Sequence, residues 1–95
     1  MKEKIRILLV DDHTLFRESL GQLLAGESDM VVVRSVGDAD SAIRSAVELS
    51  PDVILMDIDM PGLICFDAAD QILRLREKAR IIFLSAFFHD HYIEQ

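Results

Sequence analysis

Apolar and polar residues follow one another along this chain in blocks that predict alternating strands and helices. Four apolar runs rich in Val, Ile and Leu are typical of strands buried on both faces of a sheet. These runs are Ile5–Val10, Met30–Val36, Val53–Met56 and Arg80–Leu84. Three segments with apolar residues every three or four positions predict amphipathic helices. The first is Thr14–Ala25 and the third is Phe66–Glu77. The second ends at Leu49, and either Asp38 or Asp40 could be its N-cap. Residues His89–Gln95 could begin a fourth helix but are too few to assign.

The spacing within each helix predicts which side chains face the sheet. For the first helix these are Phe16, Leu20, Leu23 and Leu24; for the second, Ala42, Ile43, Ala46 and Val47; for the third, Phe66, Ala69, Ile72 and Leu73. Gly26 is expected to end the first helix, and Ser50-Pro51 the second.

This order of elements predicts an α/β domain built from βαβ units, with a parallel sheet and right-handed crossovers. In open sheets of this kind, ligands bind beyond the carboxyl ends of the strands, where the strand order reverses. Asp11 and Asp12 directly follow the first strand, and Asp57 directly follows the third. If these strands are neighbours, three carboxylates meet at one edge of the sheet.

Three carboxylates in one place repel one another unless a cation joins them. The pattern therefore predicts a divalent-cation site, with Asp12 and Asp57 as direct oxygen ligands and Asp11 holding a water. The main-chain carbonyl of Asp59 could complete the ligand set. A carboxylate can also act as the nucleophile that forms an aspartyl-phosphate, and Asp57 is best placed to do so. At the end of the fourth strand, the Ser85 hydroxyl and the Ala86 N–H could bind phosphoryl oxygens.

Each of these residues also has an ordinary explanation. Asp is a common helix N-cap, so Asp11 or Asp12 taken alone could simply cap the first helix. Asp57 and Asp59 precede Pro61-Gly62, a turn signal, and Ser85 could be only a loop residue. His13, His89 and His91 lack metal-ligand spacing, which favours surface or capping roles. The coincidence of acidic or hydroxyl residues at the ends of three buried strands favours a site over these separate roles.

Composition narrows the classes of function. The chain has 95 residues, of which 51% are hydrophobic, and a net charge of −7. This charge argues against nucleic-acid binding by this segment, because a DNA-binding face needs clustered Lys and Arg. The single cysteine, Cys65, excludes an internal disulfide and a Cys-rich metal site. No apolar stretch approaches the ~20 residues of a membrane span, and there is no signal-peptide pattern. We therefore expect a cytoplasmic protein with no membrane contact.

Taken together, the residues resemble the receiver domain of two-component response regulators. The likeness rests on Asp11-Asp12, on the D-x-x-M-P-G segment from Asp57 to Gly62, and on Ser85-Ala86. The string Asp11–Leu20 (DDHTLFRESL) is most similar to receivers fused to LuxR-type helix-turn-helix domains. The resemblance to receiver domains implies a flavodoxin-like fold with strand order 2-1-3-4-5, of which the fifth strand is missing here. We thus expect residues 1–95 to be a receiver domain that is incomplete at its C-terminus.

The resemblance also implies a mechanism. Asp57 would accept a phosphoryl group from a sensor histidine kinase, with Mg²⁺ at Asp11, Asp12, Asp57 and the Asp59 carbonyl. Ser85 would be the switch hydroxyl, and Ala86 would contact the phosphoryl group through its N–H. Phosphorylation would change the receiver surface and so alter dimerisation or release an output domain. The protein would bind DNA only through that output domain. Such a domain is not an enzyme beyond its own phosphorylation and dephosphorylation. The unpaired edge of the fourth strand further favours a homodimer or an exchange of segments between chains.

Two departures from the family pattern matter. The family has a lysine at the end of its fifth strand, whereas the lysines here (Lys2, Lys4 and Lys78) all precede strands. The segment as given should therefore be poorly competent for phosphorylation. In addition, Leu63-Ile64-Cys65 stands where the family usually has a small polar pair ending in Gly, and the loss of that Gly should reshape the start of the third helix.

Two other functions stay open at this stage. A phosphohydrolase of the haloacid dehalogenase type also places D-x-D after an apolar strand, as in Asp57-Ile58-Asp59. It needs a larger fold, however, and leaves Asp11-Asp12 unexplained. A receiver-like interaction module that is never phosphorylated is the other alternative.

Overall fold

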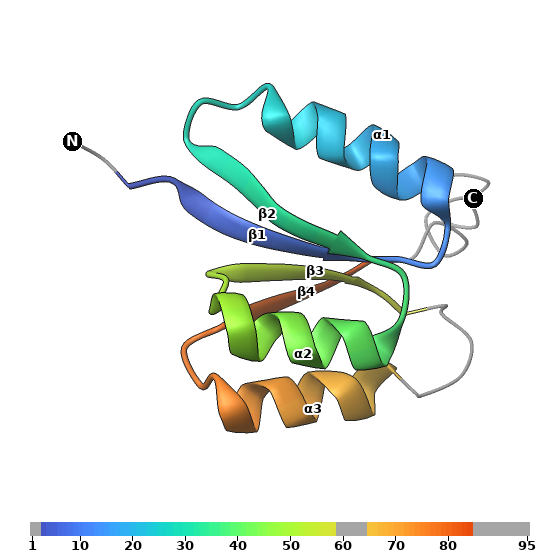
Figure 1. Cartoon of the computed structure of the whole chain (residues 1–95), viewed down its shortest axis with the longest axis vertical. Coiled ribbons are helices and arrows are strands. Elements are labelled where there is room, and N and C mark those ends of the chain that lie inside the picture. The colour runs from blue at the N-terminus through green and yellow to red at the C-terminus, as the bar shows by residue number, and fades with distance from the viewer. Residues whose placement is uncertain (1–2, 59–64, 85–95) are drawn as a thin grey trace, which may run out of the picture.

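The structure is a computed structural model, which describes residues 3–58 and 65–84. The elements follow the predicted order: β1 (Ile5–Val10), α1 (Thr14–Ala25), β2 (Met30–Val36), α2 (Ala39–Leu49), β3 (Val53–Asp57), α3 (Cys65–Leu75) and β4 (Arg80–Leu84). The four strands form one parallel sheet in the order β2-β1-β3-β4, which confirms the prediction. In Figure 1, α1 covers one face of the sheet, whereas α2 and α3 lie side by side on the other.

Two boundaries differ from the prediction. Strand β3 extends one residue further, through Asp57, because Asp57 pairs with Leu84 of β4. Helix α3 begins one residue earlier and ends two residues earlier than the predicted Phe66–Glu77. Its end is set by the turn into β4, where the Ala79 N–H donates to the Arg76 carbonyl at 3.0 Å. Residues 89–95, where a fourth helix was suggested, lie outside the described residues.

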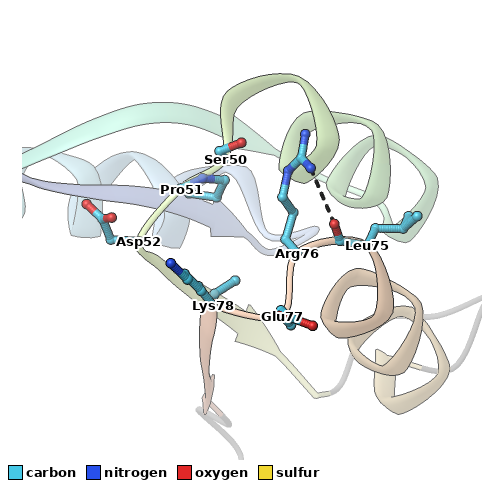
Figure 2. Close-up of a pocket in the computed structure, with 8 residues that line it drawn as sticks. Ser50, Pro51, Asp52, Leu75, Arg76, Glu77 and Lys78 are labelled. Atoms are coloured by element: carbon cyan, nitrogen blue, oxygen red, sulfur yellow. Dashed lines mark hydrogen bonds between the residues drawn. The ribbon is translucent and has the colours of Figure 1, made fainter.

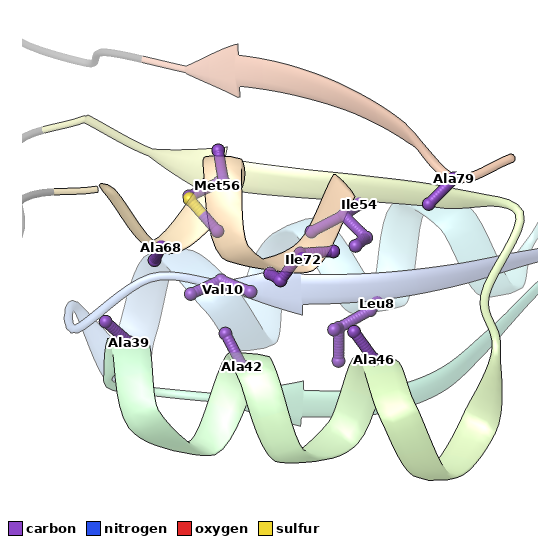
Figure 3. Packing of buried hydrophobic residues seen from close by; sticks show 11 residues of the cluster. Leu8, Val10, Ala39, Ala42, Ala46, Ile54, Met56, Ala68, Ile72 and Ala79 are labelled. Atoms are coloured by element: carbon purple, nitrogen blue, oxygen red, sulfur yellow. The ribbon is translucent and has the colours of Figure 1, made fainter. Parts of the chain in front are cut away.

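The main core lies between the sheet and the α2–α3 layer (Figure 3). On the sheet side, Leu8, Ile54 and Met56 are almost completely buried. The helices contribute mainly alanines, whose small side chains let the helix backbones approach the sheet closely. The helical and loop members of this core are Ala39, Ala42, Ala46, Ala68, Ala69, Ile72 and Ala79. Ala42, Ala46, Ala69 and Ile72 confirm the inward faces predicted for α2 and α3.

Part of the predicted inward faces is wrong. Phe66 and Leu73 are 57% and 41% exposed, because α3 turns its alanines, not its largest side chains, toward the sheet. The Phe66 ring meets Phe83 edge-on, with ring centroids 4.9 Å apart. On α1, Leu23 is 71% exposed, and no residue of this helix is fully buried. The strand residues beneath α1, Ile7 and Leu9, are nevertheless buried.

Helix ends are formed by specific side chains. The Asp38 carboxylate caps α2 by accepting the Ser41 N–H at 2.7 Å, so Asp38 and not Asp40 is the N-cap. At the other end of α2, Ser50 adopts a left-handed conformation with φ 47°. Arg6, the polar residue that interrupts the first apolar run, donates to the Leu49 and Ser50 carbonyls at 2.5 and 2.8 Å. Its charge therefore offsets the negative C-terminal end of the helix dipole.

Candidate phosphoacceptor and cation site

Strand register brings the predicted carboxylates together. Val10 pairs with Met56 in the β1–β3 ladder, so the residues that follow them, Asp11 and Asp57, end adjacent strands at the same edge. The Asp11 N–H donates to the Val36 carbonyl at 3.1 Å, which keeps β1 against β2 up to this point. Both aspartates are buried, with 7% exposure for Asp11 and 4% for Asp57. A buried carboxylate at the end of a central strand is not a surface turn residue, so the ordinary turn explanation for Asp57 fails.

The capping explanation for Asp11 and Asp12 fails as well. The N-cap of α1 is His13, whose side chain caps no helical N–H. The Asp11 carboxylate instead accepts the His13 N–H at 2.8 Å and so fixes the loop between β1 and α1. The Asp12 side chain is 30% exposed and reaches the same cluster.

The His13 ring lies among all three carboxylates. Its Nδ1 atom is 3.0 Å from Asp11 Oδ1, 3.2 Å from Asp12 Oδ1 and 3.7 Å from Asp57 Oδ2. The hydrogen bond with Asp11, followed by the negative charge of Asp12, raises the pKa of His13 above its ordinary value of 6.5. The sequence pattern predicted a surface or capping role for His13. Its ring is indeed 66% exposed and it is the N-cap residue, but its contact with the cluster was missed.

The three carboxylates of this cluster fit a hard divalent cation. One ligand atom each from Asp11, Asp12, His13 and Asp57 lies within 4.8 Å of the others. Carboxylate oxygens are the protein ligands that Mg²⁺ prefers, and it commonly binds one or two of them together with water and phosphate oxygens. A cation here would also relieve the repulsion among three carboxylates.

Arg17 is a second residue at this site that no sequence motif marks. Its guanidinium donates to the Asp11 main-chain carbonyl at 2.5 Å. Arg17 stands one helical turn after His13, and helical side chains tilt toward the N-terminus, so this direction was available from the sequence. Gly37 makes room for the guanidinium, because a Cβ atom at Gly37 would lie 2.8 Å from Arg17 Nη1.

Three predicted site residues, Asp59, Ser85 and Ala86, lie outside the described residues, as does most of the Leu63–Cys65 departure. The structure does describe the residues that lead to them. Leu84, which directly precedes Ser85, pairs with Asp57, and the Ile58 N–H donates to the Leu84 carbonyl at 2.9 Å. The chain therefore enters both undescribed segments from points beside Asp57.

A separate surface pocket of about 420 Å³ lies at the opposite edge of the sheet (Figure 2). It is lined by residues that precede β3 and β4, among them Asp52, Arg76 and Lys78. Lys4 and Lys78, the lysines of the described residues, thus stand at the amino edge, as predicted. Ligands of such sheets bind at the carboxyl edge, so the carboxylate cluster and not this pocket is the candidate site.

Comparison with known proteins agrees with this geometry. A family model described as the response regulator receiver domain matches residues 7–95. The chain belongs to the response regulator receiver domain family. This receiver domain is 43% identical over 86 residues to the transcriptional regulatory protein LiaR of Bacillus subtilis strain 168. That match covers 90% of this chain and 41% of LiaR, so the chain spans about two fifths of its relative's length.

Solved receiver structures share the fold. The response regulator domain of Thermotoga maritima CheB superposes with a TM-score of 0.82 at 38% identity, covering 88% of this chain and 62% of that chain. The signal receiver domain of the response regulator NarL from Mycobacterium tuberculosis gives a TM-score of 0.80 at 34% identity, covering 88% and 68%. The flavodoxin-like prediction is therefore confirmed. Within the described residues, no helix has both the length and the apolar character needed to cross a membrane.

Proposed function

We propose that Asp57 accepts a phosphoryl group from a phosphohistidine of a sensor histidine kinase in a Mg²⁺-dependent reaction. The observation that carries the proposal is the convergence of Asp11, Asp12 and Asp57 around one point at the carboxyl edge of the sheet. Asp57 is the most deeply buried of the three and ends the central strand β3. Membership of the receiver family supports the same role.

The transfer step is simple in chemical terms. A carboxylate oxygen of Asp57 attacks phosphorus, the new P–O bond forms, and the P–N bond to the kinase imidazole breaks. The departing imidazole keeps the electron pair and takes up a proton. Burial around Asp57 holds the carboxylate in one orientation and limits access of bulk water, while the exposed side of Asp12 leaves an open approach.

The carboxylates of Asp11, Asp12 and Asp57 would hold the Mg²⁺, together with the Asp59 main-chain carbonyl. When bound, the ion supplies positive charge that offsets charge on the phosphoryl oxygens. Arg17 and the His13 N–H keep the Asp11 loop in place for this role. The Ser85 hydroxyl and the Ala86 N–H would contact the transferred group, a role supported by the pairing of Leu84 with Asp57.

The consequence of phosphorylation would be a change in dimerisation or in an attached output domain. Relatives such as LiaR are transcriptional regulatory proteins that are longer than this chain. We therefore propose that residues 1–95 form the receiver part of a longer, cytoplasmic transcriptional regulator. DNA would be bound only by an output domain, and a second copy of the chain is the expected partner besides the kinase. The receiver would catalyse no reaction beyond its own phosphorylation and dephosphorylation.

The decisive experiment is phosphorylation of the full-length protein by acetyl phosphate with Mg²⁺. Intact-mass spectrometry should show one added phosphoryl group, which hydroxylamine removes because the product is an acyl phosphate. Asp57→Asn should abolish the addition. Asp70→Asn, the same substitution at an exposed position on α3, should leave it intact.

Other outcomes favour the other functions. No phosphoryl group together with no Mg²⁺ affinity would favour an interaction module that is never phosphorylated. Sustained hydrolysis of a small phosphate ester would favour a phosphohydrolase of the haloacid dehalogenase type. The match of the receiver family over residues 7–95 argues against that second alternative.

A further inference from the structure

The His13 ring lies among the carboxylates of the candidate cation site. Its Nδ1 atom points into the group formed by Asp11, Asp12 and Asp57, although the side chain as a whole is 66% exposed. The His13 N–H is bonded to the Asp11 carboxylate at 2.8 Å, so the backbone that carries the ring is tied to the same cluster. The ring is therefore held close to the carboxylates by its own main chain.

The distances suit coordination of a shared cation. Octahedral bonds of 2.0–2.1 Å place neighbouring ligand atoms about 3 Å apart. Nδ1 is 3.0 Å from Asp11 Oδ1 and 3.2 Å from Asp12 Oδ1, which matches two such edges. Nδ1 is 3.7 Å from Asp57 Oδ2, so a small movement of either side chain would bring this pair to the same spacing. In the structure Nδ1 forms a hydrogen bond with Asp11 Oδ1, so metal binding replaces the Nδ1 proton. The neutral imidazole then binds the metal through Nδ1 while Nε2 keeps its hydrogen.

We propose that His13 is a nitrogen ligand of this site and shifts its preference from Mg²⁺ toward first-row transition metals such as Mn²⁺ and Ni²⁺. The inference rests on the proposed cation role of the three carboxylates. Imidazole nitrogen suits Ni²⁺ and related ions, whereas Mg²⁺ prefers oxygen ligands and gives up its water reluctantly. The carboxylates bind all of these ions, but His13 contributes to the affinity for transition metals alone.

The test measures metal binding directly, with no reliance on phosphorylation. Isothermal titration calorimetry of the full-length protein gives the dissociation constants for Ni²⁺ and Mg²⁺. His13→Asn should weaken Ni²⁺ binding at least about tenfold, the low end of the loss when a metal site loses even an outer-shell partner. Its Mg²⁺ affinity should change by less than about threefold, because Mg²⁺ does not use the imidazole.

Spectroscopy then identifies the ligand atom. With Mn²⁺ bound, pulsed electron paramagnetic resonance should detect coupling to a nitrogen nucleus, and His13→Asn should remove it. His91→Asn, a substitution at another of the chain's three histidines, controls for binding elsewhere and should leave the coupling unchanged. Circular dichroism and thermal unfolding of each variant show whether it is folded.

The results separate this inference from the function on which it rests. Equal Ni²⁺-to-Mg²⁺ affinity ratios in the wild type and His13→Asn, with no nitrogen coupling, would overturn the role of His13. That result would leave the proposed phosphorylation of Asp57 unaffected. Nitrogen coupling that depends on His13, in a protein that acetyl phosphate never labels, would support the ligand and overturn the phosphoacceptor. If no divalent ion binds, both proposals fail.

Discussion

The guanidinium of Arg17 donates a hydrogen bond to the main-chain carbonyl of Asp11 at 2.5 Å, joining the first turns of α1 to the end of β1. Asp11 is 7% exposed, so this carbonyl lies in a region where lost hydrogen bonds are costly. The bond also fixes the backbone that presents the Asp11 carboxylate to the cluster. Arg17 thus acts on the candidate site by positioning one of its residues.

Arg17→Met should lower the free energy of unfolding by about 1–2 kcal/mol, because a hydrogen bond from a charged donor is lost. It should also weaken Mg²⁺ binding, since the Asp11 loop becomes less constrained. Gly37→Ala should cause a smaller loss, because its Cβ displaces only the end of a flexible side chain. Urea denaturation and calorimetry measure the two effects. An Arg17→Met protein as stable as the wild type would contradict this role.

Arg6→Met should cost about 1–2 kcal/mol of stability, because the Leu49 and Ser50 carbonyls lose a charged donor at the C-terminus of α2. Arg74→Met is the matched control. Arg74 forms an exposed ion pair with Asp70 one turn away on α3, which is worth under about 0.5 kcal/mol. Chemical denaturation of both variants gives the comparison. Equal losses would show that Arg6 has no special role at the helix end.

Ile72→Ala should destabilise the fold by about 2–5 kcal/mol, because Ile72 is completely buried and its loss leaves a cavity. Leu73→Ala, at the next position of α3, should cost less than about 1.5 kcal/mol, since Leu73 is 41% exposed. Thermal and urea unfolding measure the pair. The reverse order would contradict the burial of Ile72 and the exposure of Leu73.

Asp38 should make stability depend on pH in the acidic range. Hydrogen bonds from the Ser41 N–H and hydroxyl hold the pKa of Asp38 below its ordinary value of 3.8. Because the folded pKa is the lower one, this stabilisation is present above the ordinary pKa and is lost as the pH falls through the folded pKa. Asp38→Ala should cost about 1 kcal/mol at neutral pH through loss of the N-cap.

Unfolding of the wild type and Asp38→Asn, measured from neutral pH down to about pH 3, checks this dependence. The asparagine still caps the helix but carries no charge, so the stability difference between the two proteins should be largest at neutral pH. It should shrink only below the ordinary pKa of the carboxyl group. A difference that stays constant with pH would contradict the assignment.

The sequence determined the order of the elements within residues 3–58 and 65–84, and the edge of the sheet at which the candidate site lies. Apolar runs such as Val53–Met56 report burial on both faces of a strand, and helical spacing reports a face that must be covered. Because parallel strands end at a common edge, Asp11 and Asp57 could be assigned to one region before any contact was known. These properties follow from local patterns and from general rules of chain connection.

The tertiary structure decided what depends on distance between remote residues. The pairing of Val10 with Met56 sets how closely Asp11 and Asp57 approach, and no local pattern encodes that register. Helix α3 buries Ala68 in place of Phe66, because close packing against the sheet favours small side chains over hydrophobic content. Helical geometry directs Arg17 toward the N-terminus of α1. The partners that His13 and Arg17 meet there depend on the path of the chain between β1 and α1, which only the packed fold fixes.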